Sequence, residues 1–270
     1  MIHLNLKRQP LKKNKKKLLT KKVKCAIIKT VKGKEMKEMN KIDRRITYKI
    51  VIDTETCPLD RTFEGVDPMN MWVYDIGWVV TDKRGKVYVA RSFVVDEIFN
   101  HEEELMQSSY YAWKLQRYRE EIAEGSRIVA NFYTIRKILM ADMELYEINE
   151  VYAHNMRFDY NTLNNTQRWL TKSKYRYFLP YGTEVCDTMR MARDVIGKMP
   201  TYRYFCEKNG YLTKTGQLSM KAEHIYRFIS KDNDFVESHT GLEDVLIEKE
   251  IMAYCYRQHK KMTRQLWAKA

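Results

Sequence analysis

Residues 46–53 place the strongest constraint on what this chain can fold into. They read Ile-Thr-Tyr-Lys-Ile-Val-Ile-Asp, in which Tyr48, Ile50 and Ile52 alternate with residues of the other face, and Pro58 ends the pattern. Alternation with a period of two residues is typical of a β-strand. The sequence therefore predicts that the folded part of the chain begins with a strand.

Two more strand-like segments follow closely, at residues 71–81 and 87–95. The link between them, residues 82–86, reads Asp-Lys-Arg-Gly-Lys. Short links rich in turn-forming residues join antiparallel strands in hairpins. We therefore expect three antiparallel strands at the start of the domain.

The rest of the chain alternates between helical and strand-like segments. Residues 97–145 are enriched in Glu, Lys, Leu, Met and Ala and contain no Pro, which favours helices. The expected helices span residues 98–107, 109–124, 131–143, 160–171, 188–196, 202–208, 220–229 (with Ser219 as N-cap) and 242–259, and short strands are expected at 151–153 and 184–186. This order predicts an α/β fold: a mixed sheet of about five strands, the first three antiparallel, flanked by helices.

The positive charge is confined to one end of the chain. Residues 1–45 hold 17 Lys and Arg against only Glu35, Glu38 and Asp43, whereas the remainder holds 32 basic and 32 acidic residues. A block of like charges without apolar periodicity predicts a disordered or loosely helical arm. Such an arm is either a solubilising tail or an extension that binds phosphates, and the composition leaves both readings open.

Cysteine usage and hydropathy indicate the cellular compartment. Five scattered Cys residues with no C-x-x-C pair argue against a disulfide framework or a zinc ribbon. The longest apolar run near the start, residues 25–28, is too short for a signal peptide, and no stretch reaches the roughly 18 apolar residues of a membrane span. We expect a soluble, cytoplasmic protein with no membrane partner.

Two carboxylates stand where the first predicted strand ends. Side chains alternate along a strand, so Asp53 and Glu55 project to the same side. Carboxylate oxygens are the hard ligands that Mg²⁺ or Mn²⁺ prefers. An exposed D-x-E at a strand end is common without any metal, so this pair alone decides nothing.

Two later segments present further acidic and histidine side chains. Residues 153–159, Ala-His-Asn-Met-Arg-Phe-Asp, run from a short strand into a helix and place Asp159 at the turn. Residues 238–244, Ser-His-Thr-Gly-Leu-Glu-Asp, stand at the start of the last long helix. His239 and Asp244 lie on different sides of a regular helix, so His239 must belong to the preceding loop if both reach one site.

Together, Asp53, Glu55, Asp159, His239 and Asp244 resemble the three exonuclease motifs of the DEDD superfamily. The match is to its histidine branch, to which the proofreading (epsilon) subunit of bacterial DNA polymerase III belongs. The motifs read Ile-Asp-Thr-Glu-Thr, His-Asn-x-x-Phe-Asp and His-x-x-x-x-Asp, and Cys-Asp-Thr at 186–188 resembles the family's Asp-Thr strand end. The tyrosine branch would need Tyr at position 240, which is Thr.

The sequence departs from the family pattern at three points. Gly241 stands where the family usually has Ala, and Cys57-Pro58 replaces a small Thr-Gly-like segment. The spacing between the first two motifs is long, which suggests a helical insertion around residues 97–145. The first two departures concern substrate contacts more than catalysis.

The resemblance implies a ribonuclease H-like 3′-to-5′ exonuclease. Asp53, Glu55, Asp159 and Asp244 would hold two Mg²⁺ or Mn²⁺ ions about 4 Å apart. His239 would act as the general base, because the pKa of an unperturbed histidine is about 6.5. Thr54, Thr56, Asn155 and Phe158, which stand within the same motifs, would contact the substrate.

The expected domain spans residues 46–262, between the arm and a short tail at 263–270. Its partner would be single-stranded nucleic acid, with DNA favoured over RNA, held in part by Tyr and Phe rings that the sequence does not single out. No small-molecule cofactor is expected, and the oligomeric state is left open. The alternatives are an exoribonuclease acting on short RNA or RNA 3′ tails, and a catalytically silent nucleic-acid-binding or polymerase-accessory domain. The Lys-, Ile-, Asn- and Tyr-rich composition is typical of an AT-rich genome, such as that of a phage or a low-GC bacterium; if a phage encodes the protein, it would act in the host cytoplasm.

Overall fold

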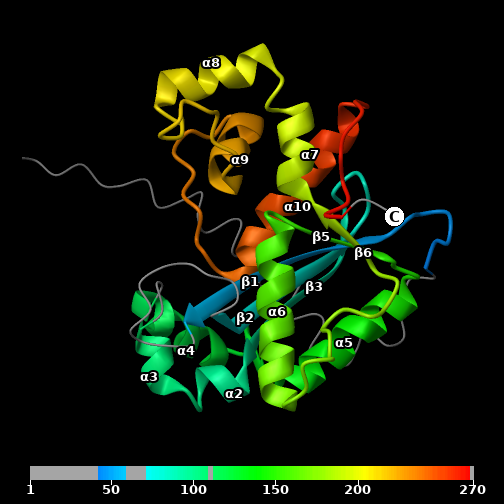
Figure 1. Cartoon of the computed structure of the whole chain (residues 1–270), viewed down its shortest axis with the longest axis vertical. Coiled ribbons are helices and arrows are strands. Elements are labelled where there is room, and N and C mark those ends of the chain that lie inside the picture. Colours follow the sequence, from blue (N-terminus) through cyan, green and yellow to red (C-terminus); the bar gives the residue numbers. More distant parts are fainter. Residues whose placement is uncertain (1–41, 59–70, 109–111, 268–270) are drawn as a thin grey trace, which may run out of the picture. The chain divides into compact units, whose positions relative to one another are not determined.

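The computed structural model describes residues 42–58, 71–108 and 112–267. Three pieces of the predicted segments lie outside the described residues: 1–41 of the basic arm, 109–111 of the second helix and 268–270 of the tail. The described part is organised around one mixed sheet, with helices packed against it (Figure 1).

The sheet has six strands in the order β4-β3-β2-β1-β5-β6. Their bounds are β1 (Lys49–Pro58), β2 (Met71–Thr81), β3 (Val87–Val95), β4 (Ile128–Ala130), β5 (Glu150–Ala153) and β6 (Glu184–Asp187). The first three strands are antiparallel neighbours, β5 and β6 extend the sheet in parallel beyond β1, and β4 pairs in parallel with β3. The predicted α/β class and the antiparallel start are confirmed. The additional strand, β4, is only three residues long and too short to show a periodic pattern.

β1 is longer at its far end than predicted. It pairs with β2 as far as Pro58, opposite Met71, so Asp53 and Glu55 lie within the strand and not at its end. The pairing shifts by one residue between Glu55 and Thr56. Pro58 is tolerated because it occupies the last position, where a missing N–H costs little. The expectation that Asp53 and Glu55 face the same side is unaffected, since both precede the irregularity.

The helices follow the predicted order, with differences at their ends. Their bounds are α2 (Asp96–Phe99), α3 (Glu103–Ser108), η3 (Ala112–Lys114), α4 (Leu115–Ala123), α5 (Phe132–Leu145), α6 (Met156–Thr171), α7 (Thr188–Val195), α8 (Pro200–Asn209), α9 (Ala222–Ser230) and α10 (Gly241–Arg257). The predicted helix 98–107 is divided into α2 and α3. Ser219 is not the N-cap of α9; Lys221 holds that position, and the Ser219 hydroxyl contacts His224 Nδ1 at 2.8 Å.

The middle of the sheet is fully enclosed. All residues of β2 are buried, which fits its nearly continuous apolar sequence, and both α6 and α10 pack against β1 and β2. Ile50 and Ile52 of β1 belong to the same buried cluster as residues of β2, β3, α5 and α6. This packing fixes β1 rigidly between two helices that both carry predicted site residues. Within the described ranges, every helix is too short or too polar to cross a bilayer.

Candidate functional site

β1 carries the first two carboxylates into the sheet. Asp53 is paired opposite Gly77 of β2, and Glu55 is opposite Asp75. Glu55 is buried, whereas Asp53 is only partly so. Three acidic groups thus face one another across two neighbouring strands, which is costly unless cations neutralise them.

Two glycines allow the start of α10 to approach these strands. A Cβ atom on Gly77 would lie 2.3 Å from the backbone N of Leu242, and one on Gly241 would lie 2.8 Å from the backbone N of Gly77. The backbones of β2 and α10 are therefore in direct contact at this point. This close approach explains why Gly, and not Ala, occupies position 241.

The approach of α10 brings Asp244 to the β1 pair. One oxygen from each of Asp53, Glu55 and Asp244 lies within 4.8 Å of the other two. The Oδ1 atom of Asp244 is buried and accepts no hydrogen bond from the described residues. A buried acceptor without a donor is rare in proteins, and a cation is one way to satisfy it. We refer to Asp53, Glu55 and Asp244 as the carboxylate cluster.

Asp159 is held beside the cluster but is not one of its three members. β5 is paired with β1 only as far as Val51 opposite Tyr152, which leaves the next part of β1 beside the start of α6. Here the Thr54 hydroxyl donates to Asp159 Oδ1 at 2.8 Å. Asp159 is buried in the first turn of α6. It is close enough to Asp53 to contribute to the electrostatics of that carboxyl.

Burial raises the pKa of each of these carboxyls, and repulsion by neighbouring carboxylates adds to the shift at Asp53, Glu55 and Asp244. Burial is the largest cause of the high pKa of Asp53, followed by the charges of Asp159 and Glu237. Burial, then Asp53, raises the pKa of Glu55, and burial with Asp53 does the same for Asp244. Burial raises the pKa of Asp159 to about 7, although the hydrogen bond from Thr54 acts in the opposite direction. Without cations, the site therefore favours protonated carboxyls.

The cluster suits a divalent cation better than any other described feature of the chain. It presents several oxygen ligands in one buried place, one of them unsatisfied, with charges that repel one another. Mg²⁺ and Mn²⁺ prefer such carboxylate oxygens. Asp53, Glu55 and Asp244 are the described residues that could hold such an ion, and Asp159 is adjacent to them.

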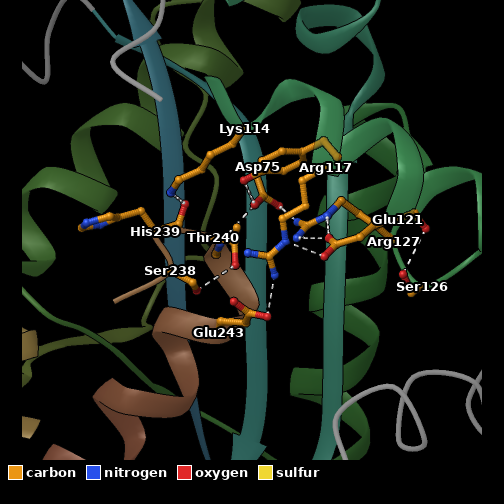
Figure 2. Close-up of polar contacts among 12 residues, drawn as sticks. Asp75, Lys114, Arg117, Glu121, Ser126, Arg127, Ser238, His239, Thr240 and Glu243 are labelled. Carbon is orange, nitrogen blue, oxygen red and sulfur yellow. Dashed lines mark hydrogen bonds and ion pairs between the residues drawn. The ribbon is translucent and has the colours of Figure 1, made fainter. Parts of the chain in front are cut away.

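His239 lies in the loop before α10, as its spacing from Asp244 requires. Its backbone is left-handed, with φ of 52°, and its ring is partly exposed, with Nδ1 3.8 Å from Glu237 Oε2. Burial, followed by the nearby positive charge of Lys114, lowers the pKa of His239. The imidazole is therefore neutral near pH 7. Figure 2 shows it directed away from Asp75.

A buried ionic network fixes the loop that contains His239. The fully buried Asp75 accepts hydrogen bonds from Tyr118 Oη and Arg127 at 2.7 Å each, and from the backbone N of Gly241 at 3.0 Å (Figure 2). Arg127 also donates to Glu121. Asp75 thus connects the first residue of α10 to α4 and to the segment just after it.

Lys114 makes a second connection between the loop before α10 and the helical segment formed by η3 and α4. It is buried, and its amino group donates to the carbonyl oxygen of His239. Burial lowers its pKa, whereas Glu55 and Asp244 oppose that shift. Its positive charge therefore lies close to the carboxylate cluster. Arg117 adds a third connection, donating to Glu243 at 2.7 Å.

The other predicted substrate residues are spread around this centre. Thr54 is buried and engaged with Asp159, and Thr56 is partly exposed. Asn155 is exposed and left-handed, with φ of 66°, at the N-cap of α6, and Phe158 is partly exposed. Asn155 and Phe158 are therefore accessible to a bound molecule, whereas the Thr54 side chain has a structural contact.

Four residues of the site were not identified from the sequence. Asp75 is the acidic residue within an otherwise apolar strand, a signal that could have marked it. Glu248 lies one helical turn after Asp244 and accepts from the backbone N of His154 at 3.0 Å. The positions of Lys114 and Glu237 depend on how distant segments fold together, and no local pattern marks them.

Known structures share this architecture at low sequence identity. No family model matches the chain, and no curated protein matches it. One similar structure is a 3′-exonuclease described for 3′-end-specific recognition of a histone mRNA stem-loop, with 15% identity over 94% of this chain and 78% of that one, and a TM-score of 0.56. A full-length 3′-exonuclease aligns with 14% identity over 83% of this chain and 88% of that one, with a TM-score of 0.55. The chain therefore has a ribonuclease H-like fold, which it shares with these two 3′-exonuclease structures.

Proposed function

We propose that this protein is a metal-dependent 3′-to-5′ exonuclease that releases nucleoside 5′-monophosphates from single-stranded nucleic acid. The observation that carries the proposal is the carboxylate cluster, built on β1 and α10 within an exonuclease fold. The same residues match the motifs of the histidine branch of the DEDD superfamily. Fold and site chemistry therefore support the same reaction.

Asp53, Glu55 and Asp244 would hold the metal, and Asp159 would complete the ligand set for a second ion. The chemistry that bound divalent ions would supply there is activation of water for attack on phosphorus and stabilisation of the leaving 3′ oxygen. The chain contributes their placement: β1 is fixed between two helices, and the Gly77 contact sets the position of α10. The high pKa values of the free carboxyls mean that metal binding must compete with protons.

His239 would accept a proton from the attacking water. It is neutral at physiological pH because its pKa is lowered, and a general base must be neutral to accept a proton. Two hydrogen bonds fix the loop that carries His239: Lys114 donates to the backbone carbonyl of His239, and the backbone N of Gly241 donates to Asp75. The ring is left partly exposed, so it can rotate toward a substrate.

The substrate class includes both DNA and RNA. The sequence analysis favours single-stranded DNA, with Thr54, Thr56, Asn155 and Phe158 near the scissile end. RNA is the second candidate, because a structure of the same fold is a 3′-exonuclease that recognises a histone mRNA stem-loop. The folded part would span residues 46–262, with a helical insertion around 97–145 and the basic arm 1–45 adding electrostatic affinity.

The test uses 5′-labelled single-stranded DNA and RNA of the same sequence, with Mg²⁺, Mn²⁺ or chelator. We expect a ladder that shortens from the 3′ end only with metal and disappears in Asp53→Ala. Asp232→Ala serves as the matched control, because Asp232 is exposed and follows α9. The strand that is degraded faster identifies the sugar. A label that survives intact under every condition would contradict the proposal and leave a silent binding domain.

A further inference from the structure

The segment between α6 and β6 exposes several aromatic rings in a basic context. Tyr175 and Tyr177 are 78% and 51% exposed, and Tyr181 is fully exposed. Residues 160–183 include four basic residues and no acidic one. Large exposed rings carry a cost in water, and interleaved rings and cations are typical of surfaces that bind single-stranded nucleic acid.

The rings are paired with the cations beside them. Arg168 lies over the ring of Tyr177 at 4.9 Å, and Lys174 lies over the ring of Tyr175 at 5.2 Å. On neighbouring α5, Lys137 lies over the exposed Tyr133 ring at 4.7 Å. Each pair offers a flat face and a positive charge together, which suits a base and its phosphate.

The segment is anchored, so its rings are presented from a fixed backbone. Phe178 is fully buried and packs on Phe132 of α5, with ring centroids 4.9 Å apart. Its backbone N donates to Asn164, and its carbonyl oxygen accepts from Arg136 at 2.6 Å. In Figure 1 the segment runs from the end of α6 along α5 toward β6. A pre-organised surface loses less entropy when it binds a ligand.

Two guanidinium groups, those of Arg136 and Arg176, lie near each other on this surface. Burial lowers the pKa of Arg136; Tyr133 opposes that shift, and the nearby charge of Arg176 adds to it. Glu97 approaches the same end of α5, but its carboxylate accepts from the backbone N of Phe132. Two guanidinium groups near each other favour an anion between or beside them.

We propose that Tyr133, Lys137, Arg168, Tyr175 and Tyr177 form a binding surface for single-stranded nucleic acid away from the carboxylate cluster. This proposal rests on the proposed function, because the bound strand is the same one whose 3′ end enters the cluster. α6 connects the two places: Asp159 is in its first turn, and Lys172 follows its last residue, about 20 Å away at 1.5 Å per residue. The surface would hold the 5′ part of a long substrate.

The prediction is a dependence on substrate length. The full chain is compared with Tyr175→Ala/Tyr177→Ala, using a trinucleotide and a strand of about 20 nucleotides. The KM for the long strand should rise at least about 30-fold in the variant, since two rings that each stack on one base are removed, while kcat and the trinucleotide kinetics stay unchanged. Tyr204→Ala, which removes an exposed ring from α8, is the matched control and should change neither. An unchanged KM for the long strand, or an equal rise for both substrates, would overturn the proposal.

Binding is measured separately, so that the surface is tested even if no cleavage occurs. The same two tyrosine substitutions are placed in the full chain carrying Asp53→Ala, and affinity for labelled oligo-dT and oligo-U is measured. If both oligo-dT and oligo-U bind more weakly than to the Tyr204→Ala control, the proposed binding surface is supported. A difference in affinity between the two oligonucleotides shows which sugar the surface prefers. A strand without bases is tested on the Asp53→Ala protein with and without the two tyrosine substitutions. Ring stacking would be refuted if this strand binds both proteins as tightly as oligo-dT binds Asp53→Ala alone. Absence of cleavage with this binding effect intact would refute only the proposed activity.

Discussion

Removing Arg127 should destabilise the protein more than removing any surface arginine. Its guanidinium is 4% exposed and donates to the fully buried Asp75 at 2.7 Å. In Arg127→Met, the donors left to the Asp75 carboxylate among the described residues would be Tyr118 and the Gly241 backbone. Breaking a buried ion pair from one side typically costs about 3–5 kcal/mol, because the other charge stays buried. That is a large share of the roughly 5–15 kcal/mol by which a domain is stable.

The assay is a double-mutant cycle in the free energy of unfolding, measured by urea titration. Arg127→Met should lose about 3–5 kcal/mol, and adding Asp75→Asn should recover part of that loss, since the unpaired charge is then removed. Arg119→Met is the matched control: Arg119 pairs with Glu103 at 3.6 Å with both side chains more than half exposed, and it should cost less than about 1 kcal/mol. A loss below about 1 kcal/mol in Arg127→Met, or strict additivity in the cycle, would refute the reasoning.

Three further predictions concern the site itself. In chelator, the free energy of unfolding should fall as pH rises from about 4 to about 7. In the folded state Asp159 and Glu237 keep their protons up to a pKa of about 7, whereas in the unfolded state they lose them at lower pH. Mg²⁺ should flatten this decline, and a free energy of unfolding that stays constant over this pH range in chelator would contradict the prediction. Gly77→Ala should lower the free energy of unfolding by at least about 1–3 kcal/mol, since the new Cβ would lie 2.3 Å from the backbone N of Leu242; a urea midpoint equal to that of the unsubstituted protein would show that α10 can move away. His239→Gln should reduce kcat by about 10²–10⁴ while leaving the Mg²⁺-induced rise in melting temperature intact; loss of that rise would make His239 a metal ligand and not a base.

The strand pattern was the part of the fold that the sequence predicted best. Ile50 and Ile52 lie in the buried cluster as expected, but Lys49 and Val51 between them are buried as well, because helices cover β1 on both faces of the sheet. The end of β1 was less predictable, because pairing with β2 extends it to Pro58. β4 and the division of α2 from α3 depend on tertiary packing, which local propensity does not encode.

The cluster of Asp53, Glu55 and Asp244 was predictable because each residue stands in a recognisable local motif. Two other features of the site could not be predicted from the sequence. Lys114 reaches the site from a helical segment more than fifty residues beyond β1, and its amino group contacts a backbone carbonyl, for which the sequence has no signature. The role of Gly241 as a point of backbone contact emerges only when β2 and α10 are placed together. Both depend on long-range packing and not on residue type.

The central claim is that the carboxylate cluster binds the metal that drives removal of the 3′ nucleotide. Its most direct test is the rate of release of a 3′-labelled terminal nucleotide as Mg²⁺ or Mn²⁺ is titrated, for the full chain and for Asp244→Asn. The account predicts a rate that is zero in chelator, rises and saturates with metal, and falls by at least about 100-fold in Asp244→Asn. Release that persists in chelator, or that is unchanged in Asp244→Asn, would contradict it.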